Sequence, residues 1–77
     1  MQAQELLAHF FDRRPTADLP FVLGDTVDVI DGIYAGRRGE VVILAFAENP
    51  IRFLVEFDDG TDETFPASSL KLVHRAT

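Results

Sequence analysis

The 77-residue chain contains no cysteine, so it can form neither disulfide bonds nor thiolate metal sites. Tryptophan is also absent. A chain of this length forms one domain, close to the lower size limit for a self-supporting core. Packing alone must therefore hold the core together, and the seven phenylalanines are its expected anchors.

The sequence lacks the features that direct a protein to a membrane. No basic segment precedes an apolar one near the N-terminus, and the longest apolar run is short. We therefore expect no signal peptide, no membrane span and no membrane partner, and we expect a cytoplasmic location.

Positive charge is scarce. Seven Lys and Arg residues against 13 Asp and Glu residues give a net charge of −6, and the excess falls after residue 14. Proteins that bind nucleic acid usually gain affinity from a basic face that displaces counterions from phosphate. The charge thus weighs against nucleic acid as the partner, although an acidic body can still carry a small basic patch.

The first fourteen residues carry the pattern of an amphipathic helix over 2–13. One apolar stripe recurs at helical spacing and consists of Ala3, Leu6, Leu7, Phe10 and Phe11. Pro15 should end the helix, because the residue before a proline avoids helical backbone angles. We therefore divide the chain into an N-terminal helix (1–14), a proline-bounded connector (15–20) and a β domain (21–77).

From residue 21 the apolar period changes to two. This pattern predicts strands at 25–30, 37–46, 51–57, 61–65 and 70–73, with a single helical turn at 66–69. The Asp-Asp-Gly-Thr sequence at 58–61 is a strong hairpin signal, because Asp-Gly suits a two-residue turn. The expected fold is mainly β, a small five-stranded antiparallel barrel with one N-terminal helix.

Two parts of the β domain resemble known families. Alternating valines followed by spaced glycines make 24–41 resemble the KOW motif, and 53–73 resembles the second half of a Tudor-type domain. Both families have an SH3-like barrel, which the resemblance implies here. The glycines expected to have structural roles are Gly32, Gly36, Gly39 and Gly60. Gly39 holds the most characteristic KOW position, so we expect a positive φ or a close backbone approach there.

The loop between the first two strands is the first candidate binding site. In KOW domains the corresponding loop contacts RNA or a partner protein. Here it carries the candidate partner-binding residues Ile33, Tyr34, Arg37 and Arg38. Aromatic and arginine side chains are common anchors in interfaces. The alternative is that Tyr34 caps the barrel while the two arginines are merely solvated.

A second apolar face is the other candidate. If Val41, Ile43 and Ala45 point into the core, then neighbouring apolar residues point outward and need a cover. The expected helix-docking or partner-binding patch consists of Leu6, Leu7, Phe10, Phe11, Val42, Leu44 and Leu54. The helix would cover the strands of its own chain or of a second copy in a homodimer.

No pattern indicates catalysis, a cofactor or a metal. His9 and His74 have no second ligand at a useful spacing. The acidic residues at 58–63 lack the spacing of a calcium loop and are expected to keep a hairpin soluble. An aromatic cage for a methylated ammonium would have to come from Tyr34 and phenylalanines such as Phe46, Phe57 and Phe65.

We therefore expect a non-catalytic binding module. The first hypothesis is a protein–protein interaction domain, or a small accessory subunit of a larger complex. The alternative is an RNA-, ribosome- or transcription-associated KOW domain, which requires Arg37, Arg38, Arg52 and Arg75 to converge on one face. A third hypothesis is Tudor-like recognition of a basic or methylated peptide.

Overall fold

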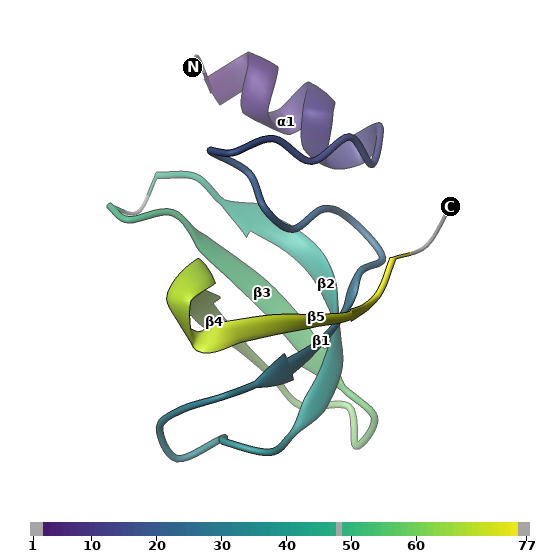
Figure 1. Ribbon diagram of the computed structural model, residues 1–77, viewed down its shortest axis with the longest axis vertical. Helices are drawn as coiled ribbons and strands as arrows, with labels where there is room; N and C mark the ends of the chain where they lie inside the picture. The colour runs from purple at the N-terminus through teal and green to yellow at the C-terminus, as the bar shows by residue number, and fades with distance from the viewer. Residues whose placement is uncertain (1–2, 48, 76–77) are drawn as a thin grey trace.

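A computed structural model describes residues 3–47 and 49–75, and Figure 1 shows their arrangement. The elements, in chain order, are α1 (Ala3–Phe11), β1 (Thr26–Val29), β2 (Arg38–Ala45), β3 (Arg52–Phe57), β4 (Asp62–Pro66), the 3-10 turn η1 (Ala67–Ser69) and β5 (Leu70–His74). The prediction of five strands with one N-terminal helix is confirmed. Within the described residues, no helix has the length and apolar character needed to cross a bilayer.

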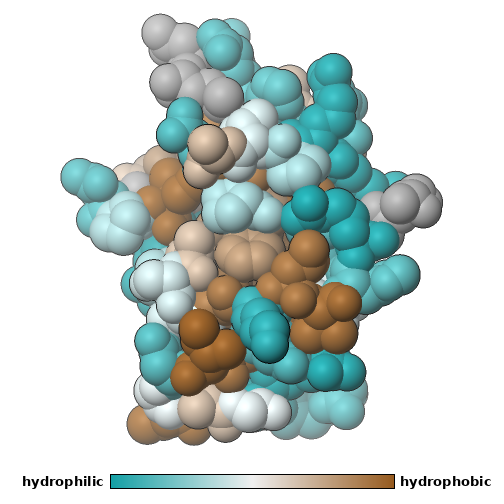
Figure 2. Space-filling view, viewed as in Figure 1, coloured by the Kyte–Doolittle hydropathy of each residue, from teal (hydrophilic) through white to brown (hydrophobic). Residues whose placement is uncertain are grey.

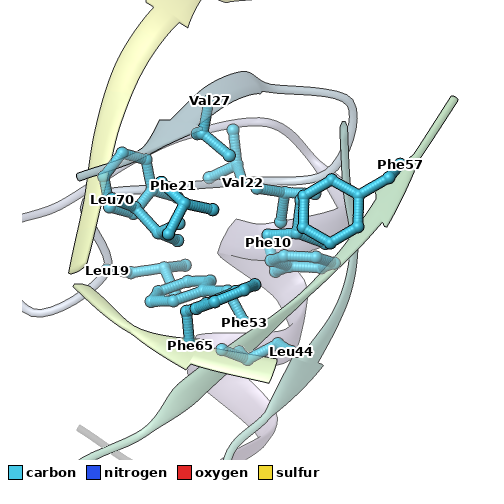
Figure 3. Packing of buried hydrophobic residues seen from close by; sticks show 13 residues of the cluster. Phe10, Leu19, Phe21, Val22, Val27, Leu44, Phe53, Phe57, Phe65 and Leu70 are labelled. Carbon is cyan, nitrogen blue, oxygen red and sulfur yellow. The ribbon is translucent and has the colours of Figure 1, made fainter. Parts of the chain in front are cut away.

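The five strands form one antiparallel sheet in the order β4-β3-β2-β1-β5. The sheet is open, because no strand ladder among the described residues joins β4 to β5. Instead, η1 connects these two edge strands directly. The sheet curls around a core built from the inward side of every strand, which Figure 3 shows at close range.

A β-bulge in β2 changes which side chains reach the core. Val41 is opposite Val55 and Ile43 is opposite Leu54, so Val42 is an extra residue without its own partner. As a result Leu44 is buried in the core, while the Ile43 side chain is 54% exposed. The predictions that Ile43 points inward and that Leu44 belongs to an outer patch are therefore wrong.

The segment before β1 supplies a large part of the core. Four of its apolar side chains are buried: Phe10, Leu19, Phe21 and Val22. Figure 3 shows Phe10 entering from the helix and Leu19 from the connector, among side chains of the sheet. The Phe21 ring also packs edge-on against Phe53, with centroids 5.4 Å apart. The N-terminal segment is therefore part of the folded unit.

The helix meets the core of its own chain at one end of the sheet, with the connector between helix and strands (Figure 1). Leu6 packs against the core beside Phe10, whereas Phe11 is 60% exposed. The predicted stripe is therefore wrong at Phe11. The expected docking over Val42, Leu44 and Leu54 is also wrong at Leu44, since that residue is a core residue.

An ion pair with a fully buried carboxylate fastens Arg75, which follows β5, to the segment that leads into β1. The Asp25 carboxylate is fully buried and accepts hydrogen bonds from Arg75 Nε (3.2 Å) and Nη2 (2.9 Å). It also accepts one from the backbone N–H of Val22 at 3.0 Å. Arg75 Nη2 donates to the carbonyl oxygen of Pro20 at 2.8 Å. This bidentate pair links the residues before β1 to the residue after β5, at the end of β1 opposite the β1–β2 loop.

Candidate interaction surface

The loop between β1 and β2 is held by its own backbone hydrogen bonds. The Val29 N–H donates to the Arg37 carbonyl oxygen and the Gly36 N–H donates to that of Val29, each at 2.8 Å. Gly32 and Gly36 have φ angles of +73° and +90°, which side chains with a Cβ adopt only under strain. Glycine adopts these angles without strain because it has no Cβ, so these two positions suit glycine.

Tyr34 folds back from this loop onto the aromatic part of the core. Its ring stacks on Phe57, with centroids 5.7 Å apart and planes 12° apart. It also meets the Phe65 ring edge-on at 5.7 Å. Tyr34 is half-buried and therefore anchors the loop to β3 and β4.

Arg37 lies over the same aromatic group from the solvent side. Its guanidinium carbon is 4.2 Å from the Phe57 ring centroid, within the range of a cation–π contact. Its Nη2 atom forms an ion pair with Asp59 Oδ2 at 3.0 Å. Arg37 thus bridges the β1–β2 loop and the β3–β4 hairpin.

Asp59 is organised by the hairpin that carries it. The Thr61 hydroxyl donates to its Oδ1 atom at 2.6 Å, and the Thr61 backbone N–H donates to the same atom at 3.0 Å. These two bonds, helped by the nearby Arg37 guanidinium, lower the pKa of Asp59 to about 2. The carboxylate is therefore ionised at neutral pH and available to hold Arg37.

Ile33 precedes Tyr34 in the same loop and is 95% exposed. We define the loop surface as Ile33, Tyr34, Arg37 and Asp59. Three of these residues are tied to each other or to the core, and the fourth presents an apolar side chain to solvent. Chemically, the loop surface combines one exposed apolar side chain with a charged pair that is already held in place.

Arg38 is separate from the loop surface, although the sequence placed it in the same candidate site. Its Nε atom donates to Asp28 Oδ1 at 2.8 Å and its Nη2 atom to Asp28 Oδ2 at 3.2 Å. Through these bonds each group favours the charged form of the other, which lowers the pKa of Asp28 and raises the pKa of Arg38. The structure therefore brings Tyr34 and Arg37 together at Phe57, leaves Ile33 exposed beside Tyr34 in the chain, and turns Arg38 toward β1.

The basic side chains do not converge on one face. Gly39, next to Arg38, is opposite Phe57, whereas Arg52 is opposite Ala45 at the other end of the same ladder. These ends are roughly 20 Å apart at the usual rise per residue. Arg52 is engaged by Thr64, and Arg75 lies beside Asp25.

Gly39 sits where β2 passes closest to β3. Its φ angle is not in the positive range, but a Cβ there would lie 2.6 Å from the Glu56 carbonyl oxygen and 2.6 Å from a Val55 methyl carbon. Of the two reasons considered for a glycine at this site, the structure points to close approach. The remaining predicted glycine, Gly60, occupies the turn of the β3–β4 hairpin.

Exposed apolar side chains also occur away from the loop surface. Ile30, which follows β1, is 53% exposed, and Leu72 and Val73 on β5 are partly exposed. In Figure 2, hydrophobic surface gathers over the middle and lower part of the view, where β1 and β5 lie in Figure 1. The described residues form no pocket and no group of three His, Asp or Glu residues placed to hold a metal ion.

Sequence reasoning missed Asp59 as part of this surface. The hairpin pattern placed Asp59 in a turn, but no local signal linked it to Arg37, which lies 22 positions earlier. No family model, curated protein or solved structure matches this chain. The KOW-like and Tudor-like resemblance therefore stays a prediction from the sequence.

Proposed function

We propose that the chain is a non-catalytic protein-binding module with an SH3-like fold, which contacts its partner through the loop surface. The strand order and the 3-10 turn between β4 and β5 support the fold assignment. The observation that carries the function is Ile33, an apolar side chain 95% exposed on a hydrogen-bonded loop.

Burial of such a side chain by a partner is energetically favourable. A fully exposed isoleucine that becomes buried contributes about 1.5–3 kcal/mol. Because backbone bonds and the Tyr34–Phe57 stack already fix the loop, little conformational entropy is lost on binding. Arg37 and Asp59 add a polar rim whose charges restrict the choice of partner.

The same contacts favour a protein over RNA as the partner. Arg37, Arg38 and Arg75 form ion pairs with carboxylates, and Arg52 donates to Thr64. A guanidinium in an ion pair must give up its carboxylate before it binds phosphate. Together with the net charge of −6, this leaves little driving force from counterion release.

A Tudor-like cage is a weaker reading for a related reason. Phe57 and Phe65 are buried, and Arg37 already covers the solvent side of Phe57. A methylated ammonium would have to displace Arg37 from both Phe57 and Asp59. The loop surface is therefore better suited to contact a folded or extended protein through Ile33.

Affinity capture from the native cell tests this function. Tagged full-length chain, its Ile33→Ser variant and its Ile30→Ser variant are compared, since Ile30 is an exposed isoleucine outside the loop surface. We expect a protein captured by the first and third baits and lost with Ile33→Ser. Equal capture by all three baits, or recovery chiefly of nucleic acid that weakens with salt, would contradict the proposal.

A further inference from the structure

The outer face of β2, β3 and β4 has its own chemistry. Glu40 is opposite Glu56, and Glu56 is opposite Asp62. Residues directly opposite each other share a face of the sheet, and the neighbouring pair Val41 and Val55 fills the core side. The three carboxylates therefore form one row across three strands on the solvent side, and all three residues are exposed.

This row works against the stability of the sheet. Directly opposite side chains lie about 5 Å apart, and like charges in such positions repel. Among the residues that the structure describes, no ion pair or side-chain hydrogen bond involves any of the three. The nearest arginine on β2, Arg38, is committed to Asp28.

An apolar pair lies beside the acidic row. Ile43 is opposite Leu54, two residues from Glu56 along β3 and roughly 7 Å from the row. The bulge at Val42 turns Ile43 outward, where it is 54% exposed. The outer face thus combines a line of negative charge with an adjacent apolar strip, and beyond the strip it carries Arg52, whose guanidinium is bonded to Thr64.

We propose that this outer face binds a basic amphipathic segment of a partner protein, with lysine or arginine side chains over the acidic row and an apolar side chain on Ile43 and Leu54. Charge complementarity selects the occupant. The row repels phosphate, so nucleic acid and anionic lipid surfaces do not fit.

The apolar strip distinguishes a protein segment from a simple polyamine as the ligand of this face. A polyamine would neutralise the carboxylates but would leave Ile43 in water, whereas an amphipathic segment covers both the acidic row and the apolar strip. The proposal does not depend on the loop surface, because none of its residues belongs to the outer face. The two sites can therefore be tested separately on the same chain.

The test is an NMR titration of the isotope-labelled full chain. The probes are a 16-residue peptide with lysines on one helical side and leucines beside them, the same peptide with glutamate in place of lysine, and spermidine. We expect the lysine peptide to shift amide signals of β2, β3 and β4, centred on Glu56 and Ile43. We expect the glutamate peptide to cause no shift and spermidine to bind much more weakly.

Matched variants locate the site. Glu56→Gln should weaken the lysine peptide about threefold at low salt, as expected for one exposed ion pair, while Glu5→Gln on α1 should leave it unchanged. Ile43→Ser should weaken binding of the lysine peptide more than Glu56→Gln does, whereas Ile30→Ser and Ile33→Ser should leave this binding unchanged. Glu56→Gln should also raise the thermal midpoint by relieving repulsion, so weaker binding by that variant cannot come from unfolding.

Three results would overturn the proposal. One is equal weakening by Glu56→Gln and Glu5→Gln, which would reveal binding to overall charge. Another is a set of shifts centred on residues 33–37 instead of the outer face. The third is binding of spermidine as tightly as the lysine peptide, which would leave no role for Ile43 and Leu54.

Discussion

Replacing Phe10 with alanine removes the helix's main contribution to the core. Its ring is fully buried among side chains from the connector and the sheet (Figure 3). Truncation of a buried phenylalanine to alanine costs about 3–5 kcal/mol, from lost burial and the cavity left behind. A domain of this size has a total unfolding free energy of about 4–12 kcal/mol. We therefore expect Phe10→Ala to lower the thermal midpoint by more than about 10 °C.

Phe11 provides the matched control, because it is the adjacent residue, has the same side chain and is 60% exposed. Phe11→Ala should cost less than about 1 kcal/mol. Urea denaturation followed by circular dichroism measures both variants with one assay. Similar shifts of the denaturation midpoint, or a loss below about 1 kcal/mol for Phe10→Ala, would refute the conclusion that the helix belongs to the folded unit.

Three further predictions concern stability. Arg75→Ala should cost about 2–3 kcal/mol in urea denaturation, since it leaves the Asp25 carboxylate buried without its ion-pair partner. Arg75→Lys should recover only part of this, because a single ammonium nitrogen cannot occupy the positions of both Nε and Nη2. Gly39→Ala should cost roughly 1–3 kcal/mol, because its new Cβ would lie 2.6 Å from the Glu56 carbonyl oxygen; an unchanged midpoint would show that the strands move apart freely. Folding lowers the pKa of Asp59 from 3.8 to about 2, so the folded state binds fewer protons than the unfolded state, and the stability that Asp59 contributes at neutral pH should fade as the pH drops from about 4 to 2. Asp59→Asn should reduce this loss of stability in acid denaturation. An identical loss in the variant would contradict the lowered pKa of Asp59.

The sequence was a good guide where its pattern alternates clearly. In β3, the charged residues Arg52 and Glu56 occupy one side of the strand and Phe53, Val55 and Phe57 the other, and the structure buries those three. The hairpin at 58–61 follows from its Asp-Gly turn for the same local reason. Such patterns report which side of a strand faces water.

The apolar run of Val41, Val42, Ile43 and Leu44 carries no such information. Every member is hydrophobic, so polarity cannot reveal that Val42 is an extra residue that moves Leu44 inward. The helix stripe fails at Phe11 for a comparable reason. Helical spacing shows which residues share a side, but the route of the connector decides how many of them reach the core.

Contacts between distant residues were beyond the reach of local patterns. Asp25 and Arg75 lie 50 positions apart, yet their ion pair joins the start of β1 to the end of β5. Arg37 looked like a free recognition residue in the sequence, whereas in the structure it is stacked on Phe57 and paired with Asp59. Both pairings depend on strand order, which no short segment specifies.

Site-specific photo-crosslinking tests the proposed function most directly. A photoreactive amino acid is placed at position 33, with position 30 as the matched exposed control, and the full chain is irradiated in the native cell. If the loop surface binds a protein, a crosslinked protein adduct should form from position 33 and be absent or much weaker from position 30. Equal adducts from both positions, or crosslinks from position 33 chiefly to RNA, would contradict the account.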